Sequence, residues 1–164
     1  MLLKINKFLS SDDVSLKVNE SFTIDDEEFL KETRLDKNVL ITGEIYKIKD
    51  SLTFSGKLEY VITVECARCL KEFDKKIETK FLADLVEEED MESDNLQMVI
   101  TDGTIKMDQA IKQLIYLSMP MKSLCRDDCK GICPNCGVNL NEETCQCENS
   151  ITDPRFDKLK DLLK

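Results

Sequence analysis

The chain contains no histidine among its 164 residues, and it has no uninterrupted apolar run of membrane-spanning length. The absence of histidine removes the most common general base, together with catalytic sites built on Ser–His, Cys–His or histidine-ligated open zinc. The N-terminal sequence Met-Leu-Leu-Lys-Ile-Asn-Lys lacks the apolar stretch of a signal peptide. We therefore expect a non-enzymatic, cytoplasmic protein with no membrane contact and no small-molecule substrate.

Basic residues are fewer than acidic residues: the chain has 23 Lys and Arg and 33 Asp and Glu, which give a formal net charge of −10. Sequence-independent binding to nucleic acid requires Lys and Arg to displace counterions from phosphates. The acidity therefore argues against broad adhesion to nucleic acid, and any such contact must use a local basic patch. Hydrophobic residues make up 41% of the chain, enough for one domain with at most a small appendage.

The chain is rich in cysteine, with eight residues, six of them near the C-terminal end. The clearest motif is Cys133-Pro-Asn-Cys136-Gly137. Two intervening residues let both sulfurs face one ion, and glycine can adopt a positive φ that turns backbone N–H groups toward the thiolates. Cys145-Gln-Cys147 would supply a second pair of ligands. Because thiolates are preferred ligands of Zn²⁺ and a reducing cytosol disfavours disulfides, we predict a structural zinc site here.

The remaining four cysteines include the pair in Cys66-Ala-Arg-Cys69. They predict a second structural zinc ion that joins the tail to the body of the protein. Its ligands would be Cys66, Cys69, Cys125 and Cys129. Another grouping also fits the spacing: the Cys145–Cys147 pair joins Cys66 and Cys69, and the other ion is held by Cys125, Cys129, Cys133 and Cys136. The compact loop from 133 to 147 favours the first grouping. Two tetrathiolate zinc sites would bring the net charge to about −14.

Alternation of apolar and polar residues predicts a sheet of long antiparallel strands. The clearest strand spans residues 52–64, where Tyr60 and Ile62 fall on one face. A preceding strand is expected over residues 39–48 and a return strand over residues 73–81. The Cys66–Cys69 motif then lies at the tip of a long hairpin. Two short strands before residue 25, one or two helical turns over residues 25–34 and a turn at Asp102-Gly103 complete this part of the chain.

A helix is predicted over residues 108–119, with Ile111, Leu114 and Ile115 on one stripe and most of its surface buried. Pro120 ends this helix. We thus predict an α+β fold in which an antiparallel β-meander body with one buried helix spans residues 1–121. A cysteine-rich, zinc-ribbon-like tail spans residues 122–164 and ends in a short helix that starts at Asp153-Pro154. The acidic run at residues 87–94 is expected to be a solvated loop.

The predicted hairpin tip differs in charge from the rest of the chain. Residues 66–80 contain five bases and three acids, a balance of opposite sign to that of the whole protein. These bases could contact phosphate, or they could belong to an ordinary alternating surface. The candidate residues for contact with RNA or another partner are Arg68, Lys71, Lys75 and Lys76.

Two stretches of the chain resemble the bacterial YceD family. The first is Cys66-Ala-Arg-Cys69-Leu70. The second is Leu124-Cys125-Arg-Asp-Asp-Cys129-Lys-Gly-Ile-Cys133-Pro-Asn-Cys136-Gly-Val-Asn-Leu-Asn, followed by Cys145-Gln-Cys147 and Asp153-Pro154-Arg155. The resemblance implies a role in accumulation of 23S ribosomal RNA and in assembly of the large ribosomal subunit. The implied partner is that RNA or a basic large-subunit ribosomal protein. Some relatives keep the CxRC turn but lack the tail cysteines, which implies that function lies nearer the turn.

Two other functions are compatible with the cysteine motifs. Cys66 and Cys69 could form the redox pair of a cytosolic thiol–disulfide enzyme. Such enzymes place the CxxC motif at a helix N-terminus, where the thiol pKa is lowered, whereas strand patterns flank the motif here. The tail could also be a zinc-ribbon module that binds nucleic acid, although it lacks a basic recognition helix.

Overall fold

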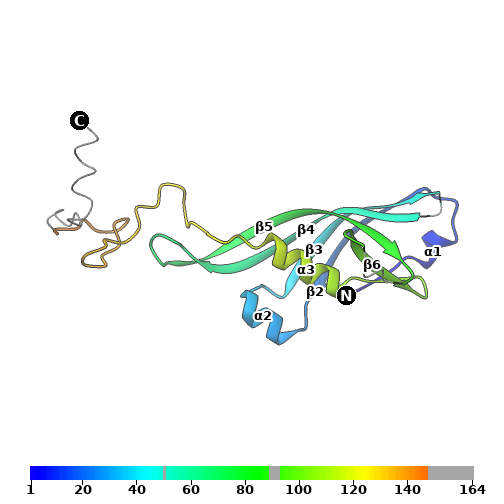
Figure 1. Ribbon diagram of the computed structural model, residues 1–164, viewed down its shortest axis with the longest axis horizontal. Coiled ribbons are helices and arrows are strands. Elements are labelled where there is room, and N and C mark those ends of the chain that lie inside the picture. Colours follow the sequence, from blue (N-terminus) through cyan, green and yellow to red (C-terminus); the bar gives the residue numbers. More distant parts are fainter. Residues whose placement is uncertain (50, 89–92, 148–164) are drawn as a thin grey trace.

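One seven-stranded sheet dominates the computed structural model, which describes residues 1–49, 51–88 and 93–147 (Figure 1). The strands lie in the order β1-β7-β6-β5-β4-β3-β2. Their bounds are β1 (Leu2–Lys4), β2 (Ser15–Thr23), β3 (Asn38–Ile48), β4 (Ser51–Glu65), β5 (Glu72–Val86), β6 (Leu96–Thr101) and β7 (Thr104–Lys106). The helices of the described ranges are α1 (Asn6–Leu9), α2 (Glu27–Thr33) and α3 (Asp108–Ser118). None of these helices is long and apolar enough to cross a membrane.

Strands β2 to β5 form the predicted antiparallel meander, but the sheet as a whole is mixed. β6 runs parallel to β5, with Ala83 opposite Leu96. β6 therefore begins beside Ala83, near the end of β5, and pairs with it as far as Val86 opposite Val99. β7 then pairs antiparallel with β6 around Asp102 and Gly103, as the turn signal predicted. The predicted α+β meander is therefore corrected to a mostly β, mixed sheet.

Several predicted segments have a different outcome. α1 was not predicted, because a helix of four residues is too short to show a helical period. The helix predicted after Asp153 and residues 89–92 of the acidic run lie outside the described residues. The division into a body of residues 1–121 and a tail of residues 122–164 stays a prediction.

The β4–β5 hairpin positions the first CxxC motif. The two strands pair continuously as far as Glu65 opposite Glu72. Tyr60 and Ile62 are buried on the face that their alternation predicted. Figure 1 shows this hairpin extending beyond the other strands toward the tail. The Cys66–Cys69 motif lies at its tip, as predicted.

α3 lies across one face of the sheet, where its buried residues Ile111 and Ile115 join the main core (Figure 1). The prediction of a mostly buried helix is corrected, because the Leu117 side chain is 77% exposed. A single helix on a sheet has one covered stripe, and the opposite stripe remains in solvent. α3 ends at Ser118, two residues before Pro120.

A buried tyrosine fixes α3 to the sheet. The Tyr60 hydroxyl lies 2.7 Å from Ser118 Oγ and donates to the Ile115 carbonyl oxygen at 3.3 Å. Tyr60 is 2% exposed. Burial raises the pKa of its phenol, so the hydroxyl stays neutral and can donate. Tyr116, at an exposed position of the same helix, instead donates to Glu32 Oε2 at 2.7 Å.

Replacing Tyr60 by Phe should lower the free energy of unfolding by about 1 kcal/mol, because the hydroxyl bonds a buried part of α3. Tyr116→Phe removes the same group from an exposed position, and its effect should stay within about 0.5 kcal/mol. Urea unfolding followed by circular dichroism measures both values. Equal losses in the two variants would contradict a docking role for the Tyr60 hydroxyl.

Candidate metal centres

The structure brings the eight cysteines together as two clusters of four. Within each cluster all the sulfur atoms lie within 4.8 Å of one another. The first cluster consists of Cys66, Cys69, Cys125 and Cys129. The second cluster consists of Cys133, Cys136, Cys145 and Cys147. This is the grouping that the compact loop favoured, and the Cys145–Cys147 pair does not join the hairpin tip.

The separations between sulfur atoms are those of metal ligands. They are 3.8 Å for Cys66–Cys129, 3.6 Å for Cys69–Cys125, 3.6 Å for Cys136–Cys145 and 3.2 Å for Cys133–Cys145. A disulfide requires about 2.05 Å. Four sulfurs at about 2.3 Å from a tetrahedral ion lie about 3.8 Å apart. Each cluster could therefore hold a metal ion.

A tight backbone turn at the hairpin tip supplies half of the first cluster. The Cys66 N–H donates to the Lys71 carbonyl oxygen at 2.9 Å, and the Leu70 N–H donates to the Cys66 carbonyl oxygen at 3.0 Å. Leu70 has a φ of +60°, the left-handed conformation that lets the chain reverse between β4 and β5. The motif thus lies between two strands, whereas a thiol–disulfide enzyme places its CxxC motif at a helix N-terminus.

The start of the tail lies against this turn and supplies the other two cysteines of the first cluster. The Ala67 N–H donates to the Ser123 carbonyl oxygen at 2.8 Å, and the Ile132 N–H donates to the Arg68 carbonyl oxygen at 3.1 Å. These bonds hold the tail on both sides of Cys125 and Cys129. The apolar residues that pack against the buried sulfurs are Phe73, Leu124 and Ile132.

The second cluster is formed within one local loop. Gly137 has a φ of +74°, and its N–H donates to the Cys133 carbonyl oxygen at 2.9 Å. Two backbone N–H groups turn toward sulfur: the Asn135 nitrogen lies 3.4 Å from Cys133 Sγ, and the Cys147 nitrogen lies 3.3 Å from Cys145 Sγ. Cys136 is exposed, whereas three cysteines of the first cluster are buried. The second cluster is therefore the more accessible of the two.

Burial and hydrogen bonding make the thiols of each cluster unequal in acidity. Burial opposes ionisation of Cys66, but nearby backbone N–H groups outweigh it and lower the pKa of this thiol to about 6. Burial raises the pKa of Cys125 to about 12. Backbone N–H groups lower the pKa of Cys133 to about 6, and a hydrogen bond to a neighbouring thiol raises that of Cys147 to about 12. A divalent cation would remove this difference by stabilising four thiolates at once.

Arg68, one of the predicted contact residues, is engaged within the protein. Its Nη1 atom donates to the carbonyl oxygens of Asp127 and Cys129 at 3.2 and 2.9 Å. The side chain thus fastens the segment between Cys125 and Cys129 to the hairpin tip. Any contact that Arg68 makes with a partner would use its other donors.

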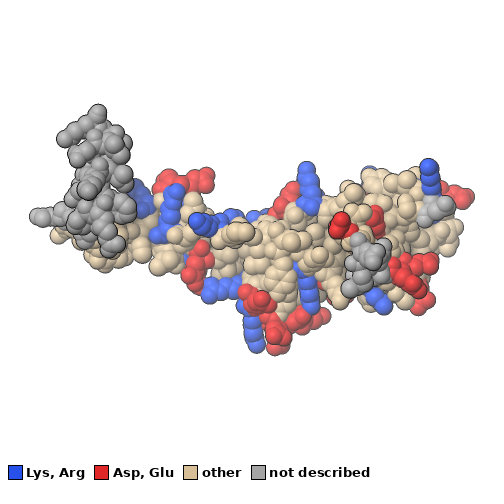
Figure 2. All heavy atoms as spheres, in the orientation of Figure 1, with Lys and Arg blue, Asp and Glu red and all other residues tan. Residues whose placement is uncertain are grey.

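The three predicted lysines lie on different surfaces. Adjacent residues of a strand face opposite sides of the sheet, so Lys75 and Lys76 of β5 point apart. Lys75 Nζ lies 3.5 Å from Ser123 Oγ, and Lys76 forms an ion pair with Glu59. The exposed side chain of Lys71 makes no hydrogen bond or ion pair within the described part of the chain. Figure 2 shows both signs of charge interspersed over the face in view.

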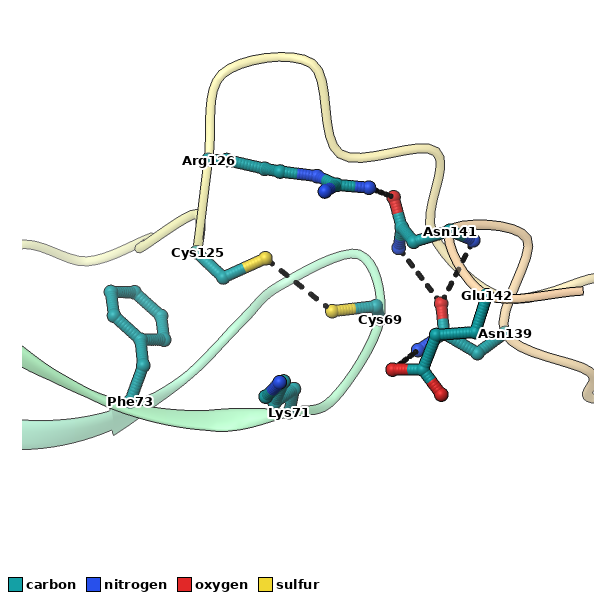
Figure 3. Close-up of a pocket in the computed structure, with 8 residues that line it drawn as sticks. All are labelled: Cys69, Lys71, Phe73, Cys125, Arg126, Asn139, Asn141 and Glu142. Carbon is teal, nitrogen blue, oxygen red and sulfur yellow. Dashed lines mark hydrogen bonds between the residues drawn. The ribbon is translucent and has the colours of Figure 1, made fainter.

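A cavity of about 340 Å³ separates the hairpin from the tail loop (Figure 3). Lys71 and Phe73 line it on the hairpin side, and Asn139 and Asn141 line it on the tail side. The Asn141 Nδ2 atom donates to Cys129 Sγ at 3.4 Å. Sequence reasoning did not single out this residue, although it ends the Gly-Val-Asn-Leu-Asn segment after Cys136.

Two glycines test how the tail is attached. Gly131 has a φ of +79°, and a Cβ there would lie 3.0 Å from the Arg68 carbonyl oxygen. Gly137 has a similar φ, but a Cβ there would meet nothing within 4 Å. Gly137→Ala should cost only the left-handed strain of about 1–2 kcal/mol, whereas Gly131→Ala should also loosen the tail from the hairpin.

Hydrogen exchange of the Ile132 amide, which donates to Arg68, measures this difference. Its protection should fall more in Gly131→Ala than in Gly137→Ala. Equal protection in the two variants would show that close approach to Arg68 does not control the attachment.

The fold and the sites define a class: a mostly β protein with one tetracysteine cluster at the tip of its longest hairpin and a second in the tail loop that follows. The family model described as "Large ribosomal RNA subunit accumulation protein YceD" matches residues 54–163, a range that contains all eight cysteines. The chain belongs to the YceD family. No solved structure matches it.

Individual relatives agree with this family. The uncharacterized protein Rv2926c of Mycobacterium tuberculosis is 32% identical over 124 residues, which cover 73% of this chain and 59% of that protein. The chloroplastic "Large ribosomal RNA subunit accumulation protein YCED homolog 1" of Arabidopsis thaliana is 25% identical over 154 residues, which cover 76% of this chain and 48% of that protein. The chain thus spans about half to three fifths of the length of these curated relatives.

Proposed function

We propose that this chain supports the accumulation of 23S ribosomal RNA and assembly of the large ribosomal subunit in the cytoplasm, as a non-catalytic binding factor with two structural zinc ions. The observation that carries the proposal is the first cluster, which joins the hairpin tip to the tail within the range matched by the family model. Membership of the YceD family supplies the link to ribosomal RNA.

The donor set supports zinc as the metal. Four cysteine sulfurs per site, with no histidine or carboxylate in either cluster, are typical of closed structural zinc centres. Such a site keeps no open position for substrate, which supports a structural role for the metal. The tail residues 119–147 contain no helix or strand in the described part of the chain, so metal ligation would supply much of their folding energy.

The protein purified under reducing conditions without chelator should carry about two zinc ions per chain, each bound by sulfur alone. Elemental analysis gives the number of ions, and X-ray absorption gives the ligand type. Removing the metal should abolish hydrogen-exchange protection after about residue 120 and leave the β4–β5 hairpin protected, because the sheet has its own core. Metal-free protein with a fully protected tail would contradict structural zinc.

The contact surface is proposed to lie at the hairpin tip, with ribosomal RNA as the partner. Lys71 is the best single probe of the predicted set, because its side chain is exposed and makes no bond that a substitution would break within the described residues. Arg68 is a poor probe, since its substitution also removes two bonds that hold the tail. Lys75 and Lys76 are also poorer probes, because each has a partner within the protein and they lie on opposite faces of β5.

Lys71→Glu should weaken binding to large-subunit RNA and lower the level of that RNA in cells without lowering thermal stability. If Lys71 contacts a phosphate, the slope of log affinity against log salt should become shallower by about 0.7–0.9. Lys106→Glu is the matched control, because Lys106 is also exposed but lies on β7, which β6 separates from β5. RNA binding and RNA levels in complemented cells are the measurements.

A basic large-subunit ribosomal protein is the alternative partner, and it would bind acidic residues instead. In that case Glu87→Gln with Glu88→Gln should be the damaging change and Lys71→Glu should be neutral. Normal RNA levels in Lys71→Glu would therefore exclude a Lys71-centred RNA contact. Normal levels in both variants would exclude both contact surfaces.

A further inference from the structure

Asn141 lies where the two cysteine clusters meet. In the sequence it stands between Cys136 and Cys145, two residues of the second cluster. Its side chain instead reaches the first cluster, where Nδ2 donates to Cys129 Sγ at 3.4 Å. A residue of one metal-binding loop is thus hydrogen-bonded to a ligand atom of the other site.

The other end of the same amide holds the backbone around the first cluster. Asn141 Oδ1 accepts from Arg126 Nη2 at 2.7 Å and from the Lys130 N–H at 2.8 Å. Arg126 follows Cys125, and Lys130 follows Cys129, so one side chain fixes the positions next to both tail ligands. Figure 3 shows the Arg126 guanidinium directed at Asn141 across the cavity.

The orientation of Asn141 is set by the loop of the second cluster. Asn139 Oδ1 accepts from the Asn141 N–H at 3.1 Å and from its Nδ2 at 2.8 Å (Figure 3). Asn139 is in turn held by a bridge to Ile132 and by N–H groups of Glu142 and Glu143, which donate to its carbonyl oxygen at 3.0 Å. This loop closes only when its cysteine ends converge, as they would on an ion.

We propose that Asn141 is a positioning residue that couples the two clusters, so that metal binding at the second cluster raises the affinity of the first. An ordered second loop places the amide on Cys129, Arg126 and Lys130 before the first ion binds. The N–H···S bond also stabilises the Cys129 thiolate as a ligand. Coupling of this kind is reciprocal, so the first site strengthens the second by the same factor. The inference rests on the proposed zinc centres.

The test titrates the full-length, reduced, metal-free chain with Co²⁺ and then with Zn²⁺ against a competing chelator. Disabling the second site with Cys136→Ser and Cys145→Ser should weaken metal binding at the first site by about 10- to 100-fold. Asn141→Ala should weaken the first site by a similar factor. Combining the two changes should add little further loss, because both remove the same interaction.

Asn141→Asp separates the bonds of the Asn141 nitrogen from those of its oxygen. It keeps the oxygen that accepts from Arg126 and Lys130, and it loses the Nδ2 donor to Cys129 Sγ and to Asn139 Oδ1, so the sulfur contact is read from the spectrum of the first site. First-site affinity should still fall, and the sulfur-to-cobalt charge-transfer band of that site should shift to lower energy because the thiolate loses its hydrogen bond. Asn135→Ala is the matched control on the same loop, since the Asn135 bond to sulfur comes from its backbone.

If Asn141→Ala and Asn141→Asp still bind two ions and their first-site affinity is unchanged, the proposed coupling is overturned. The proposed zinc centres would stand in that case. Additive losses in the combined variant would also overturn it. A wild-type chain that binds no metal would contradict the zinc centres themselves. Circular dichroism of each variant confirms that the sheet, which has a separate core, remains folded.

Discussion

Four thiols held within 4.8 Å of one another cannot all ionise unless a cation lies between them, and the end of this molecule contains two such groups. The tail between residues 119 and 147 forms only isolated bridges and turns in the described chain. Its backbone therefore depends on the sulfur clusters and on bonds to the hairpin tip. Hydrogen bonds from Arg68 and Asn141 are directed at these same points. The clusters thus decide whether the tail has one conformation.

The sheet, unlike the tail, does not depend on the cysteine clusters, because its stability comes from a large apolar core that does not include them. Buried side chains from strands β2 to β7 and from α3 contribute to that core. The sulfurs of the first cluster belong to a separate small apolar group with Phe73, Leu124 and Ile132. β4 and β5 carry their tip away from the main core, which leaves room for the tail to fold around it (Figure 1). This separation explains how one chain can combine a sheet that has its own core with a tail whose two cysteine clusters could each hold a metal ion.

Fewer basic side chains are available to a partner at the hairpin tip than the number of Lys and Arg residues there indicates. Arg68 binds carbonyl oxygens of the tail, Lys75 approaches Ser123, and Lys76 is paired with Glu59. The Lys76–Glu59 ion pair contributes little to stability but offsets the charge of Lys76, and the other two contacts direct Arg68 and Lys75 toward the tail. Of the four predicted contact residues, Lys71 combines an exposed side chain with the absence of such a bond in the described chain. A basic stretch in a sequence therefore overstates the basic surface when strand alternation sends its members to opposite faces.

The sequence alone determined the features that depend on neighbouring residues. Strict alternation predicted β4, the Asp102-Gly103 turn predicted the β6–β7 hairpin, and Cys133 and Cys136 predicted half of a local metal site. The tertiary structure decided which distant segments meet. It joined Cys66 and Cys69 to Cys125 and Cys129, made β6 parallel to β5, and directed Arg68 and Asn141 at tail atoms. Cysteine spacing favoured this grouping of the eight cysteines and left the other one open. Local periodicity did not indicate the parallel strand or the bonds of Arg68 and Asn141, because such contacts depend on how the whole chain folds back.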